Sequence, residues 1–232
     1  MHPQVGALSF TGGTATGSAV AAAVAPRFAK LSLELGGKNP LLVFADCDFD
    51  LTVEGAVRAS FLNSGQICLC ASRILVEQTA DGFYERFAAA FAAATAQLTL
   101  GAPTDAAADL GPLVSADQRR KVTALYATAA ATEGALTLSG GLDDPRVLAA
   151  EEAHGGGHWF APTVVGGLAI DAALPQTEAF GPLVTLHPFT DEEDAVSMAN
   201  ATQYGLAASV WTEDLSHIPD LLWSPLISSD LL

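Results

Sequence analysis

The sequence predicts an α/β fold, because strand and helix patterns alternate along the chain. The apolar segment Ala7–Phe10 reads as a strand, and the turn TGGTATG leads from it into an alanine-rich helix over about Ser18–Phe28. The segment KLSLEL is a second strand candidate, and the continuous apolar run Pro40–Phe44 is a third. Apolar residues then recur with helical spacing over about Leu51–Leu62, which predicts a helix. This alternation favours α/β units over an all-α or all-β fold.

The second half of the chain continues the alternation. Further strands are predicted at ILVE, ALTLSGG, FAPTVV and LAASVWT. A helix is predicted over about Asp81–Leu98, with three phenylalanines four residues apart on one face as core. Ser115 with Gln118, and Thr190 with Glu193, have the spacing of capping boxes, so further helices are expected to begin there and to reach about Thr132 and Asn200. The glycine-rich, charged segment GLDDPRVLAAEEAHGGGHW predicts a surface loop.

Composition excludes several functions. The chain of 232 residues has 10 Lys and Arg against 26 Asp and Glu, a formal net charge of −16. Such a charge repels phosphate backbones and anionic lipids, so neither nucleic acid nor a membrane surface is an expected partner. Neither of the longest apolar runs has the roughly 18 residues of a membrane span. Three cysteines argue against a disulfide framework and favour a reducing compartment, which predicts a cytoplasmic protein.

The stretch GQICLCASR places two thiols, Cys68 and Cys70, one residue apart. A zinc site would need Cys47 or the distant His154 and His158 as further ligands. A Cys68–Cys70 disulfide would close a strained, very small ring. Two buried thiols that act as small apolar side chains are a third reading. A fourth is a nucleophile, because a turn between a helix and a strand can direct backbone N–H groups at a thiolate.

A nucleophilic cysteine needs a base or a carboxylate that activates water. Glu34, in LELGGKNP, is the best candidate, because it ends a predicted strand and is flanked by leucines. An apolar setting suits a carboxylate to act as a base. A solvated charge at a strand end is the alternative reading of Glu34.

These residues carry a family resemblance. LELGGKNP followed by FLNSGQICLCASR resembles the paired active-site signatures of the aldehyde dehydrogenase superfamily. Three further segments agree with it: LSFTGGTATG, TEAFGPL and YGLAASVWT. Within the family, SLELGGKNP with GQICLC is most similar to dehydrogenases of muconic-type semialdehydes. The resemblance extends from about His2 to about Leu215 and implies an aldehyde dehydrogenase-like fold, with part of a Rossmann-type cofactor domain followed by most of an α/β catalytic domain.

The resemblance also implies roles for single residues. Cys68 is the expected nucleophile, with Cys70 incidental, and Glu34 activates the water that hydrolyses a thioester. Glu178 is expected to bind the nicotinamide ribose, with Phe180 packing beside the cofactor, NAD or NADP. Gly12 and Gly13 are expected to face the pyrophosphate at a helix N-terminus, although the family usually has Ser where Gly13 stands. Lys38 and Asn39 are expected to support the turn.

Matched to the family, the chain is expected to hold about half of a usual member. Residues 1–36 would be the end of an NAD(P)-binding domain, and residues 37–232 a catalytic domain incomplete at its C-terminus. The implied substrate is a small aldehyde. Family members are homo-oligomers, but the oligomerisation segment is expected to be missing, as is the Asn that provides a second oxyanion donor. We therefore expect no NADH production from the chain as it stands, and a catalytically silent structural protein is the alternative function.

Overall fold

The computed structural model of the protein describes residues 2 and 4–214. The chain divides into two compact units, Met1–Gly37 and Lys38–Leu232. Each unit is described by itself.

The first unit is a single strand–helix–strand motif. Strand β1 (Ala7–Thr11) pairs in parallel with β2 (Lys30–Glu34), and helix α1 (Thr14–Val24) and the 3-10 turn η1 (Ala25–Arg27) connect them. The helix begins four residues before the expected Ser18, because Gly13 adopts an extended conformation and serves as its N-cap. Both strands and the helix were otherwise predicted from the sequence.

The second unit is built on a six-stranded sheet. Its strands are β3 (Asn39–Val43), β4 (Ala71–Glu77), β5 (Leu136–Ser139), β6 (Thr163–Gly166), β7 (Leu183–Phe189) and β8 (Ser209–Trp211). Their order across the sheet is β5-β6-β7-β4-β3-β8, and all neighbours are parallel except β5 and β6. The predicted α/β class is confirmed.

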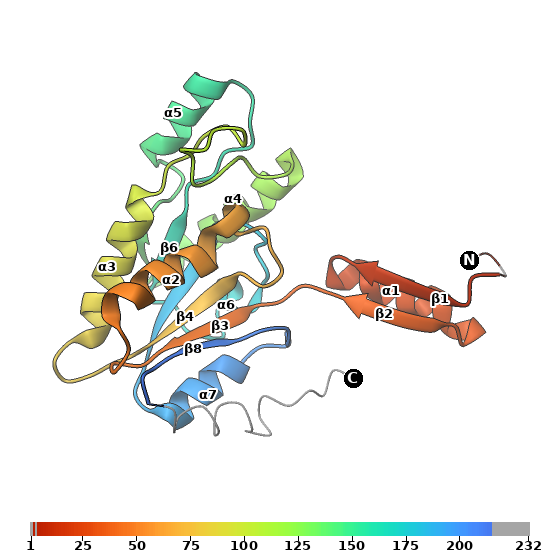
Figure 1. Cartoon of the computed structure of the whole chain (residues 1–232), viewed down its shortest axis with the longest axis horizontal. Helices are drawn as coiled ribbons and strands as arrows, with labels where there is room; N and C mark the ends of the chain where they lie inside the picture. Colours follow the sequence, from red (N-terminus) through yellow and green to blue (C-terminus); the bar gives the residue numbers. More distant parts are fainter. Residues whose placement is uncertain (1, 3, 215–232) are drawn as a thin grey trace. The chain divides into compact units, whose positions relative to one another are not determined.

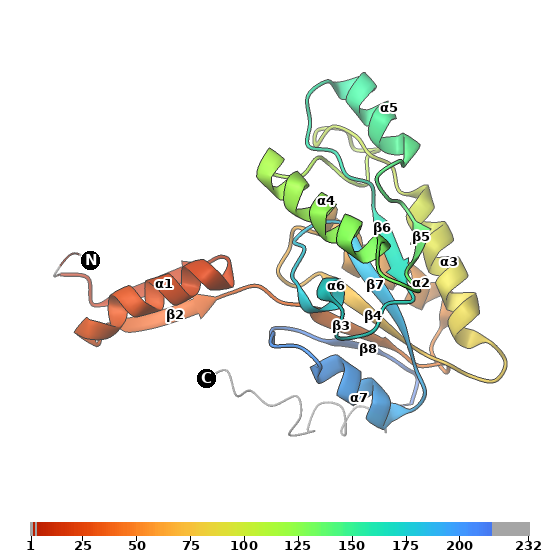
Figure 2. The same cartoon turned by 180° about the vertical axis from the view of Figure 1, so that it is seen from behind.

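Helices cover both faces of this sheet, as Figures 1 and 2 show from opposite sides. Helices α2 (Phe49–Phe61) and α3 (Phe83–Gln97) lie on one face, and α4 (Ala116–Ala130), α6 (Ala173–Gln176) and α7 (Glu192–Asn200) on the other. Side chains alternate between the two layers. Leu41 and Val43 of β3 pack with α2 and α3, whereas Leu42 packs with α7.

The three phenylalanines of α3 form part of the core, as predicted. Phe83, Phe87 and Phe91 are all buried, and the rings of Phe87 and Phe91 stack with their centroids 6.0 Å apart. Their spacing of four residues keeps them on the helix face that meets the sheet.

One predicted loop is a helix. The segment predicted as loop contains α5 (Pro145–His154), and Asp144 caps it by accepting a hydrogen bond from the Arg146 N–H at 2.9 Å. Pro145 occupies the first helical position, where proline is favoured. The prediction of a loop rested on the flanking glycines and charges and overlooked this Asp-Pro start signal. Val147 and Ala150 form the buried face of the helix.

The two predicted capping boxes have different outcomes. Ser115 caps α4 by accepting from the Gln118 N–H at 3.2 Å, as expected. At α7 the cap is Asp191, one residue after the predicted Thr190, and its carboxylate accepts from the Asp194 N–H at 2.9 Å. A carboxylate is as good a cap as a hydroxyl, so the sequence offered two adjacent candidates. The apolar segment after Asp214 lies outside the described residues.

Candidate active site

The site residues of the second unit lie at the amino ends of its parallel strands. Asn39 begins β3, Cys70 directly precedes β4, and Pro182 directly precedes β7. Neighbouring parallel strands begin at the same edge of a sheet. Asn39 of LELGGKNP, Cys70 of GQICLCASR and Pro182 of TEAFGPL therefore lie at the same edge. In many open α/β sheets ligands bind at the opposite, carboxyl edge.

The loop that carries the thiols, here called the thiol loop (residues 62–70), begins with an unusual turn. After α2 ends, the 3-10 turn η2 (Leu62–Gly65) contains Asn63, Ser64 and Gly65 with φ angles of 53°, 57° and 67°. Left-handed backbone is uncommon for residues other than glycine, so surrounding contacts must hold it. The Ser64 hydroxyl supplies one of these contacts by donating to the Gly111 carbonyl at 2.8 Å.

The two cysteines of this loop have different surroundings. Both are half-buried and free. The Cys70 thiol lies 3.6 Å from the Leu62 carbonyl, and burial raises the pKa of Cys70. Cys68 has no such contact, and among the described residues its backbone N–H donates no hydrogen bond, so this N–H is available to an oxyanion. Of the readings that the sequence left open, the structure shows no Cys68–Cys70 disulfide, and in the part of the chain that it describes no three His, Cys, Asp or Glu side chains lie close enough to hold a metal.

Glu178 lies on the segment before β7, which passes against the thiol loop. A Cβ atom added to Gly65 would lie 2.3 Å from the Gly181 carbonyl oxygen, so the glycines of the two motifs are in close contact. Phe180 has a φ of 52° and is 37 % exposed. Glu178 itself is half-buried. The close contact explains why the thiol loop needs a glycine at position 65.

Gln118 holds the Glu178 segment from α4. Its Nε2 donates to the carbonyls of Ala179 and Phe180, both at 2.7 Å. In the predicted capping box this side chain would have turned back to its own helix end. Its contact with the Glu178 segment was missed, because the local spacing of Ser115 and Gln118 does not report a partner 61 residues away.

Arg73 joins three segments beneath the thiol loop. Its side chain is fully buried, and its guanidinium donates to the carbonyls of Lys38, Met198 and Ala199 at 2.8, 2.8 and 2.6 Å. Burial lowers the pKa of Arg73 to about 10. The last two carbonyls lie in the final turn of α7, where a cation interacts favourably with the carbonyl end of the helix.

Lys38 is a second buried basic residue at the same edge. It is 1 % exposed, and its Nζ has no hydrogen-bond partner among the described residues. Burial and the nearby Arg73 charge lower the pKa of Lys38 to about 7, against the opposing effect of Glu178. His187, 2 % exposed, has its pKa lowered to about 4 by burial. The sequence did not predict this concentration of buried basic groups, because Lys38 and Arg73 are 35 positions apart.

The remaining predicted site residues belong to the first unit. Glu34 ends β2, and its carbonyl accepts the Gly12 N–H at 3.0 Å. Gly13 caps α1 without a side-chain hydrogen bond, and a Cβ added there would meet nothing within 4 Å. The first turn of α1 therefore has free N–H groups beside open space within this unit. Since Glu34 and Cys68 belong to different units, their pairing stays a prediction.

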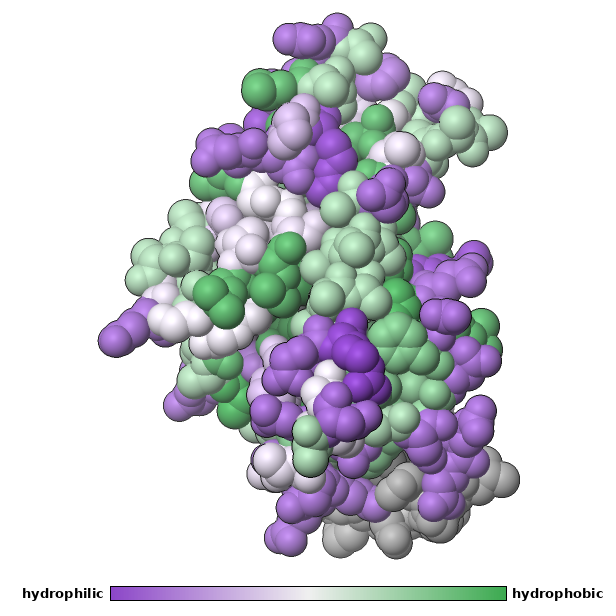
Figure 3. Space-filling view, turned by 90° about the vertical axis from the view of Figure 1, so that its left-hand side faces the viewer, coloured by the Kyte–Doolittle hydropathy of each residue, from purple (hydrophilic) through white to green (hydrophobic). Residues whose placement is uncertain are grey.

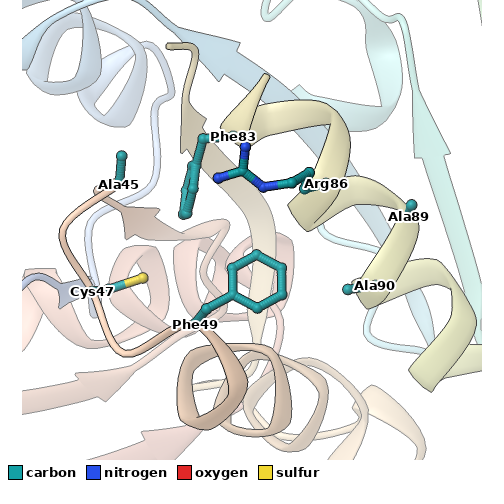
Figure 4. Close-up of a pocket in the computed structure, with 7 residues that line it drawn as sticks. All are labelled: Ala45, Cys47, Phe49, Phe83, Arg86, Ala89 and Ala90. Atoms are coloured by element: carbon teal, nitrogen blue, oxygen red, sulfur yellow. The ribbon is translucent and has the colours of Figure 1, made fainter. Parts of the chain in front are cut away.

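A groove of about 540 Å³ lies at the opposite, carboxyl edge of the sheet. Ala45, Cys47 and Phe49 line it from the β3–α2 connection, and α3 contributes residues including Phe83 and Arg86 (Figure 4). The view of the molecule in Figure 3 shows apolar side chains spread among polar ones. The groove contains none of the predicted site residues.

Comparison with known proteins decides the family. The model of the aldehyde dehydrogenase family matches residues 1–222. The chain belongs to the aldehyde dehydrogenase family. It is 44 % identical to the 2-hydroxymuconic semialdehyde dehydrogenase of Pseudomonas sp. (strain CF600) and 43 % identical to the 2-aminomuconic semialdehyde dehydrogenase of Danio rerio, over 93 % and 94 % of this chain and 43 % of each relative. The resemblance predicted from the motifs is thus confirmed.

Solved structures agree with this assignment. The betaine aldehyde dehydrogenase of Staphylococcus aureus, crystallised with NAD+, matches this chain with a TM-score of 0.86 at 34 % identity. The match covers 95 % of this chain and 42 % of that one, so this aldehyde dehydrogenase chain spans less than half the length of the relatives it matches. The predicted aldehyde dehydrogenase-like fold is confirmed. No helix in the described part of the chain is long and apolar enough to cross a membrane.

Proposed function

We propose that this chain supplies the nucleophile, the water-activating carboxylate and the nicotinamide-ribose carboxylate of an NAD(P)+-dependent aldehyde oxidation. The observation that carries the proposal is the meeting of the two motifs at one sheet edge, where Gly65 of the thiol loop lies against Gly181 of the Glu178 segment. This contact puts a free thiol and a carboxylate in adjoining loops. Membership of the family supports the same chemistry.

Cys68 performs the covalent part of the proposed reaction. Its thiolate adds to the aldehyde carbon, and the carbonyl oxygen becomes an oxyanion that the Cys68 N–H can receive. Loss of hydride from this adduct leaves a thioester on Cys68. Glu34 then takes a proton from water, which attacks the thioester, releases the carboxylic acid and restores the thiol.

The residues present fit a nicotinamide dinucleotide. In the first unit, the uncapped N-terminus of α1 at Gly13 suits a pyrophosphate. In the second, Glu178 suits the ribose hydroxyls, since a carboxylate accepts from two donors, and Phe180 offers an exposed ring beside it. When bound, the cofactor supplies the hydride acceptor. We therefore assign residues 1–36 to the end of a cofactor domain and residues 37–232 to a catalytic domain.

A muconic-type semialdehyde is the proposed substrate. Two relatives above 40 % identity are named for such substrates. These compounds carry a carboxylate besides the aldehyde, and the buried Arg73, which stays charged at neutral pH, favours an anion near that edge. Three free cysteines and the strongly acidic composition are consistent with a cytoplasmic protein.

Acylation tests the proposal without a cofactor. The purified chain is treated with p-nitrophenyl acetate, and the acetyl group is located by mass spectrometry. We expect an adduct on Cys68 that Cys68→Ser removes and Cys70→Ser retains. Glu34→Gln should prolong the life of the adduct if Glu34 activates the water. NADH production from a semialdehyde and NAD+ is measured beside it.

The outcomes separate the proposal from its alternative. An acetyl group on Cys68 whose hydrolysis depends on Glu34 supports the catalytic assignment, even where no NADH is formed. If Cys68 is acetylated no faster than Cys47 or Cys70, the nucleophile assignment is wrong. The chain is then better described as a silent member of the family with a structural role.

A further inference from the structure

The side chain of Asn39 connects three segments at the amino edge of the sheet. It is 4 % exposed and lies at the first position of β3. Its Nδ2 donates to the carbonyls of Cys68 and Cys70 at 2.7 and 3.0 Å. Its Oδ1 accepts the N–H of Ala207 at 3.2 Å. Both hydrogens and one oxygen lone pair of the carboxamide are used, and only one orientation of the amide satisfies all three partners.

The backbone around Asn39 explains why a side chain is needed. The register of β3 against β4 shifts between two adjacent residues here. Asn39 is opposite Ala71, whereas Pro40 is opposite Arg73. Proline has no N–H, so the strand next to the thiol loop loses a backbone donor at this point. The two N–H groups of the Asn39 side chain take the place of ladder donors for the carbonyls at Cys68 and Cys70. Asn39 thus supplies hydrogen-bond donors where the backbone pairing of β3 and β4 is interrupted at Pro40.

We propose that Asn39 is the positioning residue of the thiol loop, which fixes the peptide groups that follow Cys68 and Cys70 and so the direction of the Cys68 side chain. This inference rests on the proposed function only in assigning chemistry to Cys68. Asn39 makes no hydrogen bond to the Cys68 sulfur and takes no part in bond making. It acts through the loop, whose other end is held at Ser64 by the Gly111 carbonyl.

Substitutions at Asn39 separate shape from hydrogen bonding. Asp has nearly the same shape but no hydrogen to donate when ionised, so Asn39→Asp places a carboxylate against two carbonyl oxygens. Ser is shorter and keeps a single donor. Asn200→Ala is the matched control, because the Asn200 carboxamide also donates to a backbone carbonyl, that of Val196 at 2.9 Å, and does not contact the thiol loop.

The test uses the full chain with Cys47→Ala and Cys70→Ala, in which Cys68 is the only thiol. Amide hydrogen exchange is followed by mass spectrometry, and a nitroxide on Cys68 reports its mobility by electron spin resonance. We expect Asn39→Asp to accelerate exchange in residues 66–70 by about tenfold or more and to narrow the nitroxide spectrum. Asn39→Ser should give intermediate values. Asn200→Ala should lower the melting temperature and change neither readout.

Two results would overturn the inference. One is an Asn39→Asp chain that melts lower but has an unchanged spectrum and unchanged exchange in the thiol loop. The other is the same loosening in Asn200→Ala at an equal loss of stability. If Asn39→Asp does not fold, Asn39→Ser decides by the same criteria. Neither readout needs an aldehyde or NAD+, so failed acylation of Cys68 and a failed positioning role are distinguishable.

Discussion

The two edges of the six-stranded sheet differ in kind. At the amino edge, buried side chains of Asn39 and Arg73 donate to backbone carbonyls of loops, and three residues other than glycine have left-handed backbone. At the carboxyl edge, α3 and the β3–α2 connection form an apolar groove whose Arg86 is paired with Asp81 at the surface. The more obvious hollow is at one edge, whereas strain and polar cross-links are at the other. Strained backbone and buried polar groups cost free energy, and they persist where function needs a precise local geometry. They therefore locate the candidate site better than a groove does.

The largest effect is expected from removing the two arginines in turn. Arg73→Met takes the guanidinium donors away from three carbonyls, of which that of Met198 keeps the Ala201 N–H, and should lower the free energy of unfolding by about 3 kcal/mol or more. Arg86→Met breaks an ion pair whose side chains are 52 % and 72 % exposed, and should change the free energy of unfolding far less, because exposed ion pairs contribute little. Urea unfolding of both variants measures the difference. Equal losses would contradict the contrast between the edges.

A smaller difference is expected between two glycines, each in left-handed conformation. Gly65 has φ 67° and Gly82 has φ 80°. Gly82→Ala should cost about 1 kcal/mol, since its new Cβ meets only a Glu85 oxygen at 3.5 Å. Gly65→Ala should cost about 3 kcal/mol, because its Cβ would also lie 2.3 Å from the Gly181 carbonyl oxygen. The same unfolding measurement applies, and a Gly65→Ala chain as stable as Gly82→Ala would show that the two motifs are not in contact.

The pH dependence of stability tests the buried lysine of the amino edge. The pKa of Lys38 is lowered from 10.5 to about 7 in the folded chain. Between these values the unfolded chain binds more protons, so the free energy of unfolding should rise with pH from about 7 upward, by up to about 1.4 kcal/mol per pH unit. Lys38→Met should remove this contribution, whereas Lys30→Met, at an exposed position of β2, should retain it. If the free energy of unfolding changed with pH in the same way in all three chains between pH 7 and 9, Lys38 would not be held neutral in the folded chain.

Sequence reasoning found the elements and the motif residues, but not the contacts that join them. The helical stripe of α3 and five strands of the sheet follow from local patterns, which the sequence displays directly, whereas strand β7 was not predicted. The donors from Asn39, Arg73 and Gln118 reach partners 29 to 126 positions away, and no local pattern reports such pairs. Helix α5 was missed for the opposite reason, because glycines on both sides obscured a local Asp-Pro start. The pairing of Glu34 with Cys68 stays a prediction from the family motif.

The smallest expected effect compares the thiols of the two edges. Burial raises the pKa of Cys47, in the carboxyl-edge groove, and that of Cys70, so both are mostly protonated at neutral pH. Only thiolates react rapidly with alkylating agents. With a limiting amount of iodoacetamide at pH 7.5, Cys68 should be modified about tenfold faster than either, as measured by peptide mass mapping. Faster labelling of Cys47 would move the reactive centre to the groove and reverse the functional assignment of the two edges. The same order of labelling in Cys70→Ala would show that the preference for Cys68 does not depend on its neighbour.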